Sequence, residues 1–188
     1  ADTIPYNGSV VIPADDQYFV DFETNESTSG MVFDIVVDSY SADGWKSHYT
    51  NDLGQPSNTY SAYWSIGSYS DNFGPYLMIT PLLEVAEGDV LAFDAANMST
   101  KGVKVEVLYS TDRTNWRLLR TLATDAENAD DLISAEKSFK YGYAPTRYIL
   151  NNIPVGQGYV AFRPATDEAY RGAFVIDNII GCKLAEKT

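Results

Sequence analysis

Apolar and polar residues alternate with a period of two along several short stretches of this chain. The clearest stretch covers residues 103–109, and its alternate positions are Val103, Val105, Val107 and Tyr109. Side chains at alternate positions of an extended strand point to the same side, so this stretch predicts a strand with one apolar face. In a second stretch, Asp94 points away from the face shared by Leu91, Phe93 and Ala95.

Similar apolar stretches recur along the chain, and residues that favour turns separate them. Further strands are predicted at 18–22, 31–37, 60–66, 76–79, 116–122, 147–153, 159–163 and 173–180. Turns are predicted between them, as at Glu87-Gly88-Asp89 and at residues 111–115. Many short strands without intervening helices predict an all-β sandwich or barrel. Residues 125–137 have some helical character and are expected to form an excursion between strands.

Two polar stretches rich in aromatic residues are predicted to be long loops, at 38–59 and 67–75. Long loops on a rigid β scaffold often carry binding residues, and glycan binding needs aromatic platforms beside polar groups. The candidate ligand-binding residues are therefore Tyr40, Trp45, Trp64, Tyr69 and Asp71. An alternative interpretation places the two tryptophans in the core and lets the tyrosines cover strand edges.

Chain length, net charge and cysteine content exclude several classes of protein. The 188 residues suit one domain, and the net charge of −13 would repel a nucleic-acid backbone. Cys182 is the single cysteine, so no internal disulfide can form, and it is predicted to be a small buried hydrophobe. No apolar run approaches the roughly 20 residues that span a bilayer, so no transmembrane segment is expected.

The sequence carries little that predicts catalysis. Its single histidine, His48, is expected in a loop, and a lone histidine excludes metal centres built from several. Motifs of serine hydrolases, zinc proteases, phosphate-binding loops and dinucleotide-binding folds are missing from the sequence. A glycosidase needs only two carboxylates at a suitable separation and stays the enzyme alternative. We therefore expect a protein that is not an enzyme.

Six motifs in order give the chain a family resemblance. They are Asp21-Phe22-Glu23, residues 76–81 (YLMITP), residues 88–94 (GDVLAFD), residues 105–112 (VEVLYSTD), residues 158–163 (GYVAFR) and residues 174–179 (FVIDNI). Their order and spacing resemble the cleaved-adhesin and choice-of-anchor J domains of Bacteroidetes surface proteins, which are relatives of the MAM domain. The resemblance implies a jelly-roll β-sandwich of two antiparallel sheets. It covers roughly residues 18–183. We therefore expect the domain at residues 18–188, with residues 1–17 as an N-terminal linker or an added strand.

The same resemblance implies a structural calcium ion. In similar jelly rolls an acidic residue near the first strand meets one on the last strand, and these positions match Glu23 and Asp177, with Asp21 and Asn178 nearby. Carboxylate and amide oxygens are ligands that calcium prefers. The alternative pairs Asp177 with Arg163 or another cation, or leaves it at a solvated end of the sheet.

Together these observations predict a non-catalytic extracellular binding module of a secreted or surface-anchored bacterial protein, located at the outer membrane or outside the cell. Its partner would be a glycan or a host-matrix protein, and not nucleic acid. A structural spacer or protein-interaction domain within a larger surface protein is the alternative.

Overall fold

The computed structural model describes the backbone and side chains of residues 17–20, 77–97, 104–122, 146–164 and 173–185. It describes the backbone alone of residues 3–5, 34–35, 44–50, 59–65 and 123. Within these ranges the chain forms strands and turns, and there is no helix that could cross a membrane.

Thirteen strands are described, and every pair of neighbours is antiparallel. They are β1 (Thr3–Pro5), β2 (Gln17–Val20), β3 (Asp34–Ile35), β4 (Gly44–Thr50), β5 (Thr59–Ser65), β6 (Met78–Ile79), β7 (Leu83–Val85), β8 (Leu91–Asn97), β9 (Lys104–Ser110), β10 (Arg117–Ala123), β11 (Thr146–Leu150), β12 (Gly156–Pro164) and β13 (Ala173–Leu184).

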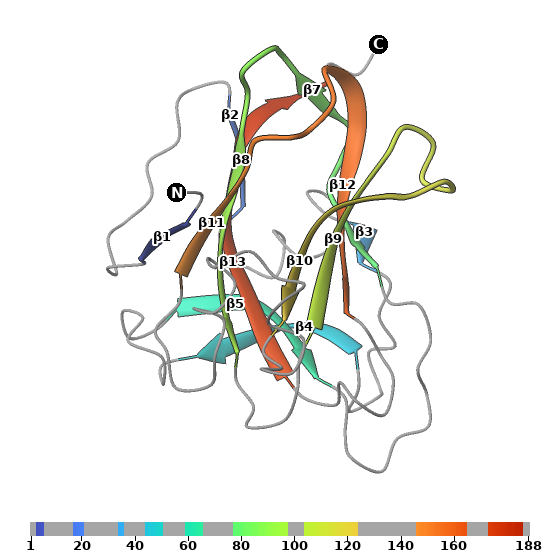
Figure 1. Ribbon diagram of the computed structural model, residues 1–188. Helices are drawn as coiled ribbons and strands as arrows, with labels where there is room; N and C mark the ends of the chain where they lie inside the picture. The colour runs from blue at the N-terminus through green and yellow to red at the C-terminus, as the bar shows by residue number, and fades with distance from the viewer. Residues whose placement is uncertain are drawn as a thin grey trace.

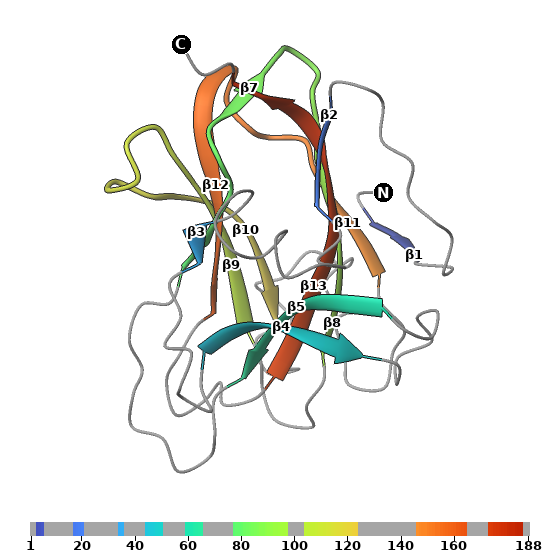
Figure 2. The same cartoon turned by 180° about the vertical axis from the view of Figure 1, so that it is seen from behind.

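The strands form two facing layers (Figures 1 and 2). In the first sheet, β8 lies between β11 and β13, and β1 pairs with the other edge of β11. The opposite edge of β13 pairs with β5 along one part and with β2 along another, and β4 extends the sheet beyond β5. In the second sheet the order is β10-β9-β12-β6-β3.

The two layers are joined at one end of the molecule, where β7 lies (Figure 1). This short strand pairs with β13 on one side and with the first residues of β12 on the other. The rest of β12 runs between β9 and β6 in the second sheet. The chain therefore folds as a jelly-roll sandwich of antiparallel sheets, as its sequence pattern and resemblance predict.

The core lies between the layers, where the inward side chains of both sheets meet. The ring of Phe93 on β8 stacks on Tyr148 of β11, with centroids 5.8 Å apart, and meets Phe162 of β12 edge-on at 5.1 Å. The predicted apolar faces of β8 and β9 are confirmed, because Leu91, Phe93, Ala95, Val105, Val107 and Tyr109 are all buried in this core. The predicted burial of Cys182 is confirmed as well.

The loop predicted at 38–59 is wrong in part, because Gly44–Thr50 forms β4 and pairs with β5 along its whole length. Trp45 and His48 consequently lie in a strand. The segment contains two aromatic residues that meet aromatic partners, because β4 places Trp45 opposite Trp64 and Tyr49 opposite Tyr60 in the register. Aromatic residues in facing positions favour strand pairing. The glycine, serine and histidine residues of the segment interrupt any alternation of apolar and polar residues, so the sequence pattern does not predict this strand.

Other boundaries differ by a few residues. Strand β7 is not predicted from the sequence, since three residues are too few to show a period. Strand β11 ends at Leu150, three residues earlier than expected, whereas β13 continues to Leu184. Strand β1 pairs with β11, and the proposed domain boundary at residue 17 stays a prediction. The helical character predicted for 125–137 lies outside the described residues.

Candidate functional site

The predicted ligand-binding residues are described only in part. Trp45 and Trp64 are register partners on β4 and β5, so the hairpin brings their backbones side by side. Their side chains lie outside the described residues, as do Tyr40, Tyr69 and Asp71. The grouping of these five residues into a glycan site stays a prediction.

Two of the four predicted metal ligands, Asp177 and Asn178, lie on β13. Asp177 is the register partner of Asp94 on β8, and both carboxylates are buried although they point away from the apolar core. Asn178 has a left-handed backbone, with φ of 46°, at an irregularity in the pairing of β13 with β8. The other two predicted ligands, Asp21 and Glu23, lie outside the described residues.

Asp94 is the centre of a polar network that joins three strands. The Arg147 guanidinium on β11 donates from Nε to Oδ1 of Asp94 at 2.9 Å and from a terminal nitrogen to Oδ2 at 3.2 Å. The Asn178 side-chain amide donates to the same Oδ2 at 2.9 Å. A buried carboxylate needs such partners, since burial without them costs several kcal/mol, on the order of the penalty for a broken buried pair.

Asp177 and Asn178 carry side-chain oxygen atoms of the kind that bind a cation. The Asn178 backbone N–H donates to one oxygen of Asp177 at 2.8 Å, and the amide nitrogen of Asn178 donates to Asp94. The amide oxygen and the Asp177 carboxylate are therefore oxygen donors on one short stretch of β13, which fits calcium. Among the described residues, however, three or more acidic, histidine or cysteine side chains are nowhere grouped to hold a metal. Arg163 is not the partner of Asp177, because it pairs with Glu106 on the second sheet.

A different surface emerges on the outer side of the second sheet. Strand alternation turns Leu108 of β9, Ala161 of β12 and Ile79 of β6 outward, and the register sets them side by side. They form a small apolar cluster against which Leu77, Trp116 and Tyr159 pack. Leu118, opposite Leu108 on β10, is 51% exposed. We call the surface formed by Leu77, Arg113, Trp116, Leu118, Tyr159 and Arg163 the outer aromatic face.

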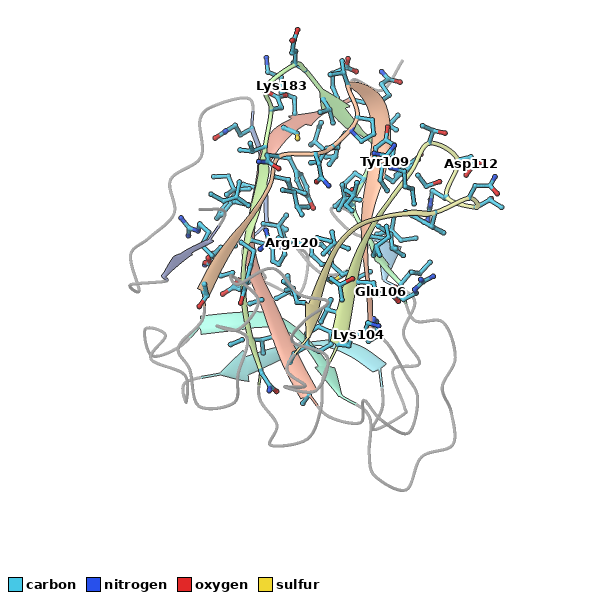
Figure 3. All side chains as sticks on the ribbon, in the orientation of Figure 1. Lys104, Glu106, Tyr109, Asp112, Arg120 and Lys183 are labelled. Atoms are coloured by element: carbon cyan, nitrogen blue, oxygen red, sulfur yellow. The ribbon has the colours of Figure 1, made fainter. Side chains whose placement is uncertain are left out.

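A tightly bonded loop between β9 and β10 borders this face, and Figure 3 shows Asp112 within it. The Asp112 carboxylate accepts hydrogen bonds from the backbone N–H groups of Thr114 and Asn115, both at 2.8 Å. It also accepts from the Asn115 side chain and the Ser110 hydroxyl, each at 2.8 Å. These donors, the Asn115 backbone first, hold the pKa of Asp112 well below its usual range.

The same loop positions Arg113 over the face. Its backbone is left-handed, with φ of 62°, and its N–H donates to the Ser110 hydroxyl oxygen at 2.9 Å. The guanidinium carbon lies 5.5 Å from the centroid of the Tyr159 ring, within the range of a cation–π contact. Farther along the sheet, Arg163 donates twice to one oxygen of Glu106, at 3.2 and 3.3 Å. Half-buried aromatic side chains are thus flanked by planar charged groups.

Sequence reasoning missed this face although a signal for it exists. In the predicted strand at 159–163, Tyr159, Ala161 and Arg163 alternate with the core residues Val160 and Phe162. The outward set could be identified from that pattern alone. Its meeting with Trp116 and the 111–115 loop could not, because the pairing of β12 with β9 joins segments about fifty residues apart.

The arrangement suits binding better than hydrolysis. Sugar rings pack on aromatic and apolar side chains, and planar polar groups at the rim fix their orientation. The two carboxylates described on this side, Glu106 and Asp112, are both engaged, one with Arg163 and the other with the donors of its own loop. A glycosidase needs one carboxyl group as an acid and a second as a base or nucleophile.

Comparisons with known proteins identify the fold. Neither a protein-family model nor a curated protein matches the chain. Among solved structures, the K1 cleaved adhesin domain of Lys-gingipain from Porphyromonas gingivalis W83 has a TM-score of 0.59 at 17% identity, covering 90% of this chain and 99% of that one. The K2 cleaved adhesin domain of Lys-gingipain has a TM-score of 0.57 at 14% identity, covering 92% and 100%.

A carbohydrate-binding module has a similar structure. The xylan-binding domain from CBM 22 has a TM-score of 0.52 at 11% identity and covers 94% of this chain and 100% of its own. Identities this low relate the proteins by fold alone. The chain therefore has the jelly-roll fold that cleaved adhesin domains and a xylan-binding module share.

Proposed function

We propose that this protein is a non-catalytic extracellular module of the cleaved-adhesin type that binds glycans through its outer aromatic face. The observation that carries the proposal is the meeting of Trp116, Leu118 and Tyr159 beside the fixed guanidinium of Arg113. The similarity to adhesin domains and to a xylan-binding domain supports this role and a location outside the cell or on its surface.

The physical basis is the combination of a rigid scaffold with amphipathic side chains. Trp116 and Tyr159 are half-buried, so they are held by packing and still present part of their surface to solvent. Aromatic side chains provide a large contact area at a small cost in conformational entropy. The hydrogen-bonded loop at 111–115 adds a preorganised polar rim, which lowers the entropic cost of binding.

A glycan array followed by titration calorimetry tests the proposal. Trp116→Ala and Tyr159→Ala are expected to weaken binding of the selected glycan about tenfold or more, since each removes an aromatic contact. Val155→Ala, at an exposed position on the β7 end of the molecule, is the control and should bind like the parent protein. Circular dichroism checks that all variants are folded.

The same experiment includes Trp45→Ala, which tests the loop site predicted from the sequence. If this variant loses binding and the Trp116 and Tyr159 variants do not, the ligand lies at the 38–73 region instead. If no glycan on the array binds, the proposed function fails.

A protein-interaction role is the second candidate, and one observation favours it. Around β7, at the end where the layers join, Val155 is 67% exposed and Leu184 is 52% exposed, and Val90 is exposed nearby. Exposed apolar residues that gather in one region are typical of protein contacts. Light scattering of the parent protein and of the Val155→Ser, Leu184→Ser double variant tests whether this end mediates self-association.

We also propose that the fold holds a structural calcium ion at Asp177 and Asn178, with Asp21 and Glu23 as the remaining side-chain ligands. When bound, such an ion would neutralise the charge that Asp177 places beside Asp94. Asp177 and the amide oxygen of Asn178 would contribute two of its oxygen ligands.

A further inference from the structure

We infer that Glu106 and Arg163 form the hydroxyl-binding part of the glycan site at the outer aromatic face, and that the ligand is an uncharged oligosaccharide with adjacent free ring hydroxyls. This inference rests on the proposed function and adds the chemical class of the ligand. It depends on the way in which the two side chains are paired and on their position relative to the aromatic residues.

The pairing of β9 with β12 holds Glu106 and Arg163 together. The two residues are register partners, so their side chains lie on the same side of the sheet. Nε and one terminal nitrogen of Arg163 donate to the same oxygen, Oε1 of Glu106, at 3.3 and 3.2 Å. Glu106 lies on β9 away from the loop that contains Asp112 (Figure 3). The double contact restricts both side chains before a ligand arrives, which lowers the entropic cost of binding.

This contact leaves hydrogen-bonding groups of both side chains available. In the part of the chain that the structure describes, no hydrogen-bond partner contacts Oε2 of Glu106 or Nη1 of Arg163. The Arg163 side chain is 38% exposed and that of Glu106 is 21% exposed, so a ligand can reach both. A carboxylate only accepts hydrogen bonds and a guanidinium only donates them. The pair therefore presents an acceptor and a donor side by side.

An acceptor beside a donor suits hydroxyl groups better than charged groups. A hydroxyl can both donate and accept, so two neighbouring hydroxyls of a sugar can donate to Glu106 and accept from Arg163. Each of these hydrogen bonds involves a charged protein group and is stronger than one between neutral groups. A carboxylate or sulfate would be repelled by Glu106, and an amine by Arg163. The net charge of −13 adds to the repulsion of anionic sugars.

The charged pair lies more than one sugar ring away from the aromatic residue on its own strand. Tyr159, Ala161 and Arg163 occupy alternate positions on the outer side of β12, and four residues of a strand extend about 13 Å. The apolar cluster lies between them, where Ala161 and Leu108 are register partners. A ligand that contacts both Tyr159 and the charged pair is therefore an oligosaccharide.

The test compares sugar chains with free and with blocked hydroxyls. Cellohexaose, xylohexaose and mannohexaose are uncharged chains, and their O-methylated forms keep the rings but lose the hydroxyl donors. Titration calorimetry of the whole protein measures each affinity. We expect at least one free hexaose to bind about tenfold more tightly than its methylated form, because methylation removes hydrogen bonds to charged groups. Hexagalacturonate, which carries a carboxylate on each ring, and the monosaccharides should bind more weakly than that hexaose.

Variants of the pair separate hydroxyl recognition from a purely structural role. Glu106→Gln and Arg163→Ala should bring the affinities for the free and the methylated hexaose close together, and should leave the affinity for the methylated form unchanged. Arg163→Lys keeps the charge without the planar group and should keep part of the difference. Trp116→Ala should instead weaken binding of both forms. A purely structural pair would change the melting temperature of the variants without changing the ratio of the two affinities.

Two substitutions control for the loss of a charge. Arg117→Ala removes an exposed arginine from β10, at the register partner of the core residue Tyr109. Glu84→Gln removes an exposed carboxylate from β7, at the end where the layers join. Both variants should keep the affinities of the parent protein. An equal loss of the hydroxyl preference in Glu106→Gln and Glu84→Gln would show a general effect of charge and overturn the assignment to the pair.

The outcomes also distinguish this inference from the function on which it rests. Equal affinities for free and methylated hexaoses, or tighter binding of hexagalacturonate or of a monosaccharide, would overturn the inferred ligand and leave the glycan-binding role intact. An array hit on another glycan, without binding of any of the three free hexaoses, has the same meaning. An array without any hit removes both proposals.

Discussion

Gly181 lies on β13 where this strand passes against the backbone of β8. Its φ of 134° is one that other residues rarely adopt, and a Cβ at this position would collide with the Val90 carbonyl oxygen. We therefore expect Gly181→Ala to lower the free energy of unfolding by about 3 kcal/mol or more, because backbone strain and a steric clash add. Urea denaturation measures the change.

Gly156 provides the matched control for this substitution. It also has a positive φ, of 115°, but a Cβ there would meet no atom within 4 Å. Gly156→Ala should therefore show only the conformational part of the loss, about 1–2 kcal/mol. Equal losses in the two variants would contradict the close approach of β13 to Val90.

Asp112 makes a prediction about pH. Its hydrogen bonds lower the pKa of the carboxyl group, so the stabilisation they give to the 111–115 loop is fully present above the ordinary aspartate pKa of 3.8 and is lost only as the pH falls through the lowered value. The amide NMR signals of Thr114 and Asn115 should consequently stay unchanged from pH 6 to about pH 3. Ser110→Ala, which removes one donor, should move the transition upward. A transition near pH 3.8 in the parent protein would contradict these hydrogen bonds.

At the level of single residues, the sequence pattern predicted to which side of a strand a side chain points, but not which residues it contacts. Alternation along β8 correctly turned Asp94 away from the core, but its burial and its contacts with Arg147 and Asn178 depend on strands that lie far apart in the sequence. The positive φ of Arg113 is equally hidden, since it arises from the hydrogen bonds of Ser110 and Asp112.

Among the elements, β8 and β11 are linked by the pair of Asp94 and Arg147. The Asp94 side chain is 0% exposed and that of Arg147 is 27% exposed. We expect Arg147→Ala to lower the free energy of unfolding by about 3 kcal/mol, since it leaves a buried carboxylate without its cation. Thermal and urea denaturation of the purified variant measure the loss.

Two comparisons control this experiment. Arg163→Ala breaks the more exposed pair with Glu106, whose side chains are 38% and 21% exposed, and should cost about 0–1 kcal/mol. The double variant Asp94→Leu, Arg147→Met should recover much of the stability lost in Arg147→Ala, because no charge is then left buried. A similar loss in the Arg147 and Arg163 variants would show that burial of Asp94 is not the cause.

Strands in which apolar and polar residues alternate were predicted from the sequence. Strands that lack this alternation and form through their pairing with neighbouring strands were not. Strand β9 alternates valines with polar residues and was located to within a residue. Strand β4 is polar and glycine-containing, and only its complete pairing with β5 makes it a strand. Strand β7 depends on β12 and β13 on its two sides. The sequence pattern within β4 or β7 could not predict these strands, because the pairing that forms them involves segments that are distant in the sequence.

For the whole molecule, the proposed calcium ion makes a prediction about thermal stability. A ligand that binds only the folded state raises its stability by mass action, so a chelator should lower the melting temperature by several kelvin and excess calcium should restore it. Asp177→Asn should melt at the same temperature with and without chelator. If the parent protein is insensitive to the chelator, Asp177 and Asn178 belong only to the network of Asp94.

The architecture as a whole was predicted from many short strands and from motif order, whereas the binding surface was not. Strand count and spacing favoured a sandwich or barrel, and the resemblance narrowed it to a jelly roll. The outer aromatic face needed the register of the second sheet, which sets Leu108 beside Ala161 and Ala161 beside Ile79.

The position of β13 has a consequence for how the protein is made. This strand bonds to residues 17–20, 59–65 and 83–97, all of which precede it by 76 residues or more. The strands that lie on the two sides of β13 thus stay unjoined to each other during synthesis until residues 173–184 have emerged, and pairing over such distances is slow. Nascent chains would spend that interval with apolar strands uncovered, in a state suited to transport before folding and dependent on holdase chaperones.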